Sequence, residues 1–154
     1  MTKVGENARG FCMPDKDERG VCLKDYSGRW VVLYFYPQDN TSGCTIEAAD
    51  FSAMKDEFKK LNAEIIGVSV DSPESHRDFV QKHSLTITLL SDEQHRVVKD
   101  WGVWGKKKLY GREYEGTIRS TFLIDSKGKV REVWGKVSVQ NHAKSVMERL
   151  KALQ

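Results

Sequence analysis

"RWVVLYFYPQDNTSGCTIEAADF", residues 29–51, carries the strongest structural signal in the chain. It opens with a continuous run of aliphatic and aromatic residues, Trp30 to Tyr36, which Pro37 ends. A short apolar run of this kind is typical of a strand buried on both faces of a parallel sheet. Turn-forming polar residues follow, and apolar residues at helical spacing predict an amphipathic helix from Gly43 to about Leu61. The segment therefore predicts a strand, a loop and a helix, with Cys44 in the first helical turn.

The rest of the chain continues to alternate strands with helices. "AEIIGVSVD" repeats the buried-strand pattern, and Ser72-Pro73-Glu74 then opens a helix with a cap, a first-turn proline and an acid. Near the C-terminus, two strands flank the turn Ser126-Lys127-Gly128. The other predicted elements are a strand in "LTITLL", residues 85–90, a helix capped by Ser91-Asp92-Glu93 that runs to about Trp101, and a closing amphipathic helix at 139–153.

Two segments lie outside this alternation. Residues 9–23, "RGFCMPDKDERGVCL", have short flanks around a polar centre and predict an N-terminal β-hairpin. A symmetric register would pair Met13 with Val21 and Cys12 with Cys22. Residues 102–117, "GVWGKKKLYGREYEGT", are rich in glycine, lysine and aromatic residues, and their length predicts a functional loop.

The predicted order is ββ-βαβαβα-ββα. Strands that alternate with helices imply a parallel sheet, and the terminal hairpin must add antiparallel strands. We therefore expect an α/β protein with a mixed central sheet, helices on both faces and an N-terminal hairpin extension. The thioredoxin-like fold is the common small architecture with this order. A length of 154 residues, with no internal repeat or linker, predicts a single domain over residues 1–154.

Composition excludes several classes of function. The net charge is only +3, which argues against a nucleic-acid-binding face. The lysines and rings of the 102–117 connector superficially suggest single-stranded nucleic acid, but a solvated loop is the simpler interpretation. Four scattered histidines and the lack of a C-x-x-C motif predict no metal site. No apolar run is long enough to cross a bilayer, and three cysteines are too few for a disulfide framework, so we expect a soluble, cytoplasmic protein.

The position of Cys44 favours chemistry. In open α/β sheets, ligands gather at the carboxyl ends of the strands, where this loop lies. Helix N-termini and nearby arginines lower thiol pKa values and stabilise a thiolate. Ionisation alone gives little, because thiolate nucleophilicity falls with pKa. A fast reaction would need groups that orient the second reactant and stabilise charge on its leaving atom, such as the Thr41 and Ser42 hydroxyls or a guanidinium.

Three other interpretations remain open from the residues alone. Cysteine is often buried and inert, so Cys44 could be a small core residue. The loop "PQDNTSGCT" could also bind an anion, as flavodoxin-like phosphate loops do. A thioredoxin-like disulfide reductase is a further alternative, but it would need the missing C-x-x-C motif and a proline near the strand that begins at Ile118.

A resemblance narrows the choice. Pro37-x-x-x-Thr41-x-x-Cys44 after an aromatic strand matches the active-site motif of peroxiredoxins. "FYPQDNTSGCTIEAADF" and "GTIRSTFLIDSKGKV" resemble the bacterioferritin-comigratory, or Q-type, branch, and the match covers essentially the whole chain. The resemblance implies that Cys44 is the peroxidatic cysteine, which attacks a hydroperoxide O–O bond and becomes a sulfenic acid. It also implies that Thr41 hydrogen-bonds the peroxide and the thiolate, that Arg119 stabilises the thiolate and polarises the peroxide, and that Pro37 shields the pocket.

The same resemblance implies partners. The substrates would be hydrogen peroxide and small organic hydroperoxides, reduced to water or alcohols without metal, haem or flavin. Thioredoxin or a similar dithiol protein would be the reductant, and the protein would be a monomer or a weak homodimer. We expect no nucleic-acid or membrane partner.

The chain departs from the branch at the resolving cysteine. Many members carry it five residues after the peroxidatic one, where this chain has Ala49, and others carry it on the next helix, where this chain has none. Three alternatives stay open: an external thiol reduces the sulfenic acid, Cys12 or Cys22 resolves it, or Ala49 is itself a substitution that traps one state. Directly opposed Cβ atoms lie roughly 4.5–5.5 Å apart, against ~3.8 Å in a disulfide. Two unbonded, half-buried cysteines are therefore the simpler expectation, and a redox couple that carries oxidising equivalents away from Cys44 is the alternative.

Overall fold

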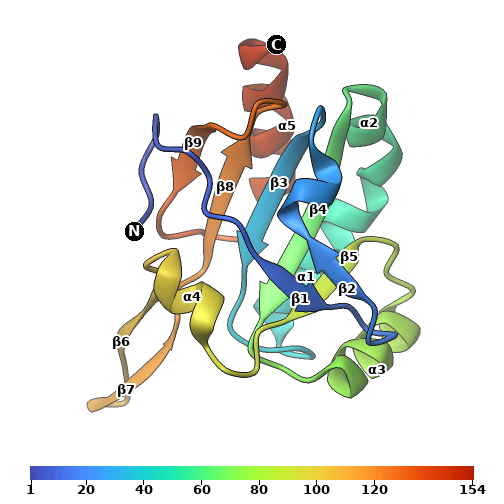
Figure 1. Ribbon diagram of the computed structural model, residues 1–154. Coiled ribbons are helices and arrows are strands. Elements are labelled where there is room, and N and C mark those ends of the chain that lie inside the picture. The colour runs from blue at the N-terminus through green and yellow to red at the C-terminus, as the bar shows by residue number, and fades with distance from the viewer.

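A computed structural model describes residues 1–154. Its centre is a five-stranded sheet in the order β5-β4-β3-β8-β9 (Figure 1). The strands β3, β4 and β5 are parallel, whereas β8 runs antiparallel to β3 and β9 antiparallel to β8. This confirms the predicted mixed sheet. The strand bounds are Trp30–Phe35 for β3, Ala63–Ser69 for β4, Thr88–Ser91 for β5, Ser120–Ile124 for β8 and Val130–Trp134 for β9.

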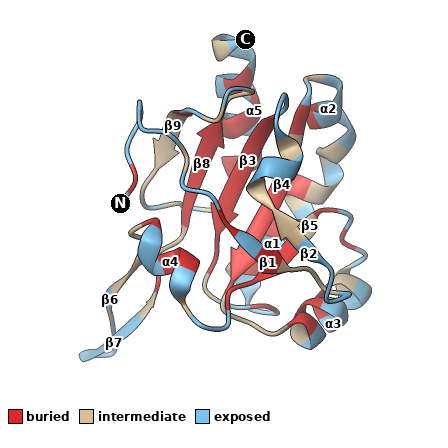
Figure 2. Cartoon of the chain, in the orientation of Figure 1, coloured by how far each residue is buried: buried red, intermediate tan, exposed pale blue.

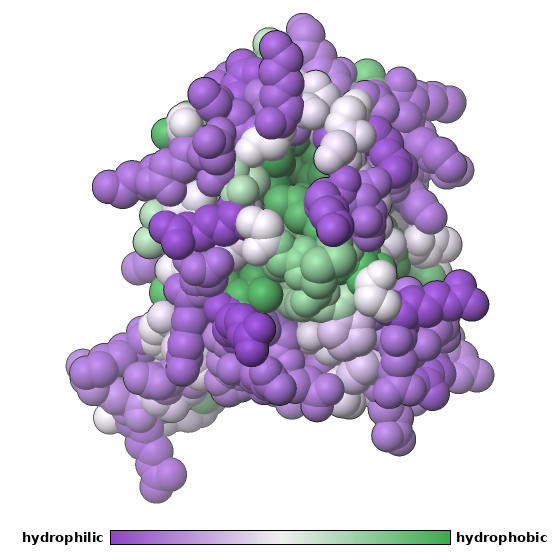
Figure 3. Space-filling view, in the orientation of Figure 1, coloured by the Kyte–Doolittle hydropathy of each residue, from purple (hydrophilic) through white to green (hydrophobic).

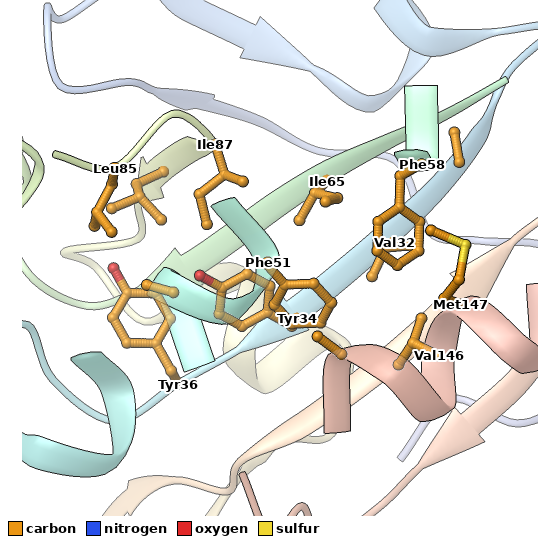
Figure 4. Packing of buried hydrophobic residues seen from close by; sticks show 14 of the residues in the cluster. Val32, Tyr34, Tyr36, Phe51, Phe58, Ile65, Leu85, Ile87, Val146 and Met147 are labelled. Atoms are coloured by element: carbon orange, nitrogen blue, oxygen red, sulfur yellow. The ribbon is translucent and has the colours of Figure 1, made fainter. Parts of the chain in front are cut away.

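Four helices cover one face of the sheet: α1 (Ser42–Ala53), α2 (Lys55–Lys60), α3 (Pro73–His83) and α5 (His142–Leu153). Their apolar side chains pack against every second residue of β3, namely Val32 and Tyr34, and against Tyr36 beyond its end (Figure 4). The single helix predicted from Gly43 is wrong, because it breaks at Met54 into α1 and α2.

The N-terminal hairpin, a 3₁₀ turn and a short helix cover the other face. These elements are β1 (Cys12–Pro14), β2 (Gly20–Cys22), η1 (Leu23–Tyr26) and α4 (Arg96–Asp100). Phe11, Met13 and Trp101 pack here against the alternate residues of β3, among them Leu33 and Phe35. The prediction of helices on both faces is confirmed. Figure 3 shows that this side is mostly hydrophilic and has one hydrophobic area near its centre.

The register of the N-terminal hairpin agrees with the prediction, since Met13 lies opposite Val21 and Cys12 opposite Cys22. The Asp15 carboxylate accepts hydrogen bonds from two turn amides and so closes the turn. A disulfide joins Cys12 to Cys22, whose Cα atoms lie 4.0 Å apart. The simpler expectation of two unbonded cysteines is therefore wrong, because this cross-strand pair is closer than an average one.

The predicted loop at 102–117 is also wrong. It folds into a second hairpin, β6 (Trp104–Leu109) and β7 (Arg112–Thr117), which projects from the body of the protein (Figures 1 and 2). Tyr110 and Gly111 have φ values of 52° and 77°, and positive φ at both central residues is what a two-residue hairpin turn of type I′ requires. Most of its residues are exposed, so no strand-like alternation of apolar residues marked it in the sequence.

Two helices are shorter than predicted. The helix expected from Ser91 starts only at Arg96, although Asp92 still accepts hydrogen bonds from the amides of Arg96 and Val98. The closing helix starts at His142 instead of Val139, after Asn141 in a left-handed conformation. No helix has the length and apolar character that a bilayer crossing requires.

Candidate active site

Cys44 lies in the first turn of α1, directly after the loop that leaves the carboxyl end of β3. Thr41 is the N-cap residue, with extended backbone, and its carbonyl accepts the amide hydrogen of Thr45 at 2.9 Å. The Cys44 side chain is 1% exposed and is the one free cysteine. The amides of the first helical turn lack partners within the helix, so they favour a negative charge at this place.

Arg119 connects this helix to the sheet. It comes just before β8, and its Nη2 donates to Cys44 Sγ at 3.2 Å. Its Nη1 donates to Glu47 Oε1 at 2.7 Å, one helical turn after the cysteine. One planar guanidinium therefore binds the thiol and a carboxylate together, with a fixed geometry that a lysine would not supply. The predicted pairing of Cys44 with Arg119 is present in the structure.

Burial and charge shift several pKa values here. Burial raises the pKa of Glu47 to about 7, although the Arg119 guanidinium opposes this. Burial would lower the pKa of Arg119, but the Cys44 thiolate and the Glu47 carboxylate outweigh it, so the pKa lies above its ordinary value. Burial also lowers the pKa of Lys107, as does the charge of Arg119, while Cys44 opposes the shift. Arg119 is thus the cation in contact with the sulfur, and the charge of Lys107 interacts with both.

His142 adds no positive charge to this region near neutral pH. Burial, together with repulsion from Arg119, lowers its pKa to about 4. Its Nε2 is hydrogen-bonded to the Thr121 hydroxyl at 2.8 Å. The neutral ring lies between Phe51 and Trp134 and helps to dock α5 against the sheet.

The other two predicted site residues lie at the rim. Thr41 is exposed, and its hydroxyl donates to the carbonyl of Gln38 at 2.9 Å, not to the sulfur. Pro37 is half-buried and lines a cavity of about 350 Å³ together with Trp104 and Lys107 of the β6–β7 hairpin. Cys44 does not line this cavity. The β6–β7 hairpin therefore forms one wall of the cavity beside Pro37.

The Cys12–Cys22 disulfide lies away from Cys44. Met13, the residue after Cys12 in β1, packs into the hydrophobic cluster that holds Leu33. Cys44 packs into the cluster on the opposite face of the sheet. The side chain of Cys12 is exposed and borders a cavity of about 260 Å³ with Asp92 and Arg96. Within one chain, the sheet separates the disulfide from the free thiol.

Comparison with known proteins decides the family. Residues 4–133 match the AhpC/TSA family. The chain belongs to this family. Peroxiredoxin Bcp of Bacillus subtilis is 44% identical over 149 residues, which cover 97% of this chain and 95% of that protein. The bcp peroxiredoxin of Helicobacter pylori is 45% identical over 148 residues, which cover 96% of this chain and 97% of that protein.

Solved peroxiredoxin structures confirm the fold. A mutant of PrxQ from Xylella fastidiosa matches with a TM-score of 0.94 at 34% identity, over 99% of this chain and 98% of that one. The bacterioferritin comigratory protein of Xanthomonas campestris matches with a TM-score of 0.88 at 38% identity, over 93% of this chain and 91% of that one. The thioredoxin-like fold and the resemblance to the Q-type branch are confirmed. The protein is a peroxiredoxin, a thiol-dependent peroxidase, which argues against the phosphate-loop and disulfide-reductase alternatives.

Sequence reasoning missed two groups near this peroxiredoxin site. The first group is Glu47, which accepts a hydrogen bond from Arg119; its place three residues after Cys44, on the same helix face, was the available signal. A cluster of Asp39, Asp71 and His76 was also missed, with donor atoms within 4.8 Å of one another. Hydrogen bonds to protein groups already engage all three side chains. We interpret the cluster as a hydrogen-bonded network and not as a metal site.

Replacement of Arg119 by Met should slow the reaction of Cys44 with hydrogen peroxide by about tenfold or more. The variant loses a charged hydrogen-bond donor beside the reacting atoms, a class of bond that contributes about 1.5–3 kcal/mol, and with it the positive charge that would stabilise the leaving oxygen. The measurement is the rate of sulfenic-acid formation at Cys44, with folding checked by circular dichroism. The matched control is Arg112→Met on the exposed strand β7, and equal rates in the two variants would contradict the prediction.

Replacement of Glu47 by Gln should change the pH dependence of stability. The folded pKa of about 7 exceeds the ordinary 4.5, so the stabilisation from this carboxyl is complete below pH 4.5 and is lost as the pH rises through 7. The difference in free energy of unfolding, variant minus parent, should therefore be roughly 2–3 kcal/mol larger at about pH 8 than at about pH 5. Urea unfolding at both pH values measures this, and the exposed Glu57→Gln variant should show no such gain.

Proposed function

We propose that the protein reduces hydrogen peroxide and small organic hydroperoxides through a sulfenic acid at Cys44, and that a dithiol protein such as thioredoxin regenerates the enzyme. The observation that carries the proposal is the hydrogen bond of 3.2 Å from Arg119 to the buried sulfur at the start of α1. The family to which the chain belongs supports the peroxidase step. The substrates, the reductant and the roles of the individual residues are the proposed part.

The chemical step follows from the charges around the sulfur. The Cys44 thiolate attacks the hydroxyl oxygen of ROOH, an S–O bond forms and the O–O bond breaks. The leaving alkoxide or hydroxide takes a proton and departs as ROH or water, which leaves Cys44 as a sulfenic acid. The Arg119 guanidinium, held by Glu47 at 2.7 Å, stabilises the thiolate before attack and the negative charge on the leaving oxygen during it. Thr41 would orient the peroxide from the rim, and Pro37 would shield the approach.

The face of the sheet that holds Cys44 carries no second cysteine, so regeneration of Cys44 needs a thiol from elsewhere. Ala49, at the usual resolving position, is exposed and carries no sulfur, and the other two cysteines lie on the opposite face. The sulfenic acid would therefore condense with a thiol of a second molecule, releasing water and forming a mixed disulfide. A second thiol of the reductant would then release Cys44 as a thiolate. This is the behaviour of a one-cysteine enzyme.

The Cys12–Cys22 disulfide has a separate proposed role as a redox couple. In the reducing cytoplasm where we expect this chain, a protein disulfide is usually transient and takes part in redox chemistry. Exposure of Cys12 leaves the bond open to an attacking thiolate. Because the sheet separates the pair from Cys44, oxidising equivalents could pass between them only from one copy of the chain to another or through the reductant.

The peroxidase step is tested with one equivalent of hydrogen peroxide and a sulfenic-acid trap. The parent should carry the adduct on Cys44, found by mass spectrometry, and should consume peroxide in the presence of thioredoxin and its reductase. Cys44→Ser should lose at least about a hundredfold of this activity, because no other free thiol remains. An unmodified Cys44, or undiminished turnover in the variant, would refute the proposal.

The redox-couple role has its own test. During several turnovers with limiting thioredoxin, the Cys12–Cys22 bond should open and re-form, as differential alkylation reports. A Cys12→Ser/Cys22→Ser variant should turn over at least about threefold more slowly while its single-turnover rate with peroxide is unchanged. A pair that keeps one redox state throughout, together with full activity of the double variant, would show that the disulfide is only structural.

A further inference from the structure

The loop before Cys44, residues 37–43, is held in place by one buried residue. Among residues 37–43, only Asp39 is buried, at 5% exposure, while its neighbours on both sides are half-buried or exposed. In each hydrogen bond between this loop and α3 or the segment after β4, the loop residue is Asp39. Asp39 is two residues before Thr41 and five before Cys44. Because Asp39 is held in place, it determines where the loop joins the start of α1.

The partner of Asp39 is a histidine with no solvent contact. His76 of α3 is 0% exposed, and its Nδ1 lies 2.7 Å from Asp39 Oδ2. Its Nε2 lies 2.9 Å from the carbonyl oxygen of Leu90 in β5. The histidine therefore ties the loop to a helix and to a strand of the sheet at once.

The protons of this pair follow from the partners. A carbonyl oxygen only accepts, so His76 Nε2 must carry a hydrogen and donate to Leu90. The short contact between Nδ1 and Asp39 Oδ2 then requires one proton, carried by the imidazole or by the carboxyl group. The carboxyl group of Asp39 also accepts two other hydrogen bonds, from Tyr36 to Oδ1 at 2.7 Å and from Ser75 to Oδ2 at 2.8 Å. The network is complete and buried, which makes it rigid and costly to disrupt.

The backbone of Asp39 is fixed as well. Its amide donates to Asp71 Oδ2 at 2.8 Å, and the Ser69 hydroxyl donates to the same oxygen at 2.7 Å. The next residue, Asn40, has a positive φ of 64°, which turns the chain toward the helix start. Side chain and backbone of Asp39 are thus held from two directions before the chain reaches Thr41.

We propose that Asp39 and His76 are positioning residues for the peroxidatic cysteine: the buried pair holds the 37–43 loop so that Cys44 meets the guanidinium of Arg119. The inference rests on the proposed function for its consequence in catalysis. Neither residue touches the sulfur or the peroxide. They act through the loop, and a misplacement of about 1 Å costs on the order of a hundredfold in rate when reacting groups must be aligned.

The pair predicts a graded series of variants. His76→Asn removes the ring and leaves the Asp39 carboxyl group buried without its main partner, so the reaction of Cys44 with hydrogen peroxide should slow by about tenfold. Tyr36→Phe keeps the ring and removes one hydrogen bond to Asp39, so the rate should fall about threefold. Asp39→Asn can still donate to Nδ1 of a neutral His76 and accept from Tyr36, so it should keep the rate within about twofold of the parent.

The controls separate positioning from general damage. His83→Asn lies on the same helix, and none of its polar groups contacts the loop, so its rate with hydrogen peroxide should match the parent. All rates are measured on variants shown to be folded by circular dichroism. If His76→Asn does not fold, the isosteric Tyr36→Phe variant decides the question in the same assays.

The outcomes are distinct. Slowing in the order His76→Asn, Tyr36→Phe, Asp39→Asn, with His83→Asn unchanged, supports the proposal. A folded His76→Asn variant with the parental peroxide rate, or a parental rate in Tyr36→Phe where His76→Asn fails to fold, overturns it, even if the melting temperature has dropped. That result leaves the proposed function standing, whereas a parent whose Cys44 gives no sulfenic acid with peroxide refutes the proposed function itself.

Discussion

The guanidinium of Arg119 is the group on which the site depends. It is 75 residues from Cys44 and 72 from Glu47 in the chain, yet it binds both side chains. The antiparallel register of β8 on β3 makes this possible, since Ser120 lies opposite Phe35, where β3 ends and the loop to Cys44 begins. The pairing of β8 with β3 thus brings a fixed positive charge to the N-terminus of α1, where the helix dipole already favours an anion. Neither the helix nor the strand would create the site alone.

Buried charge is the cost of this arrangement. Glu47 is 1% exposed and keeps one carboxylate oxygen without a partner, and its raised pKa reflects the same burial. Removing one member of a buried pair is strongly destabilising, whereas the intact pair adds little to stability. The Asp39–His76 pair follows the same rule on the other side of the loop. Both pairs fix geometry around Cys44, and the large apolar clusters on the two faces of the sheet stabilise the fold.

The central sheet also separates two kinds of sulfur chemistry. Alternate residues of β3 point to opposite faces, so Cys44 packs on one side with Tyr34 while the disulfide hairpin packs on the other with Leu33. The sheet, with β3 and β8 buried at its centre, blocks direct contact between the free thiol and the disulfide within one chain. Under the proposed redox couple, electron flow between them would involve a second molecule.

The sequence by itself determined the elements whose signals are local. The apolar run before Pro37, the caps of α3 and the symmetric hairpin register around Met13 follow from side-chain pattern and turn chemistry, and the motif around Cys44 placed the thiol at a helix start. The β6–β7 hairpin escaped prediction because most of its residues are exposed, so it shows no apolar periodicity. Only the tertiary structure decided that Glu47 holds Arg119, that Asp39 meets His76 and that the disulfide faces away from Cys44. These contacts depend on strand register and on the face to which a side chain points, which join residues far apart in the chain.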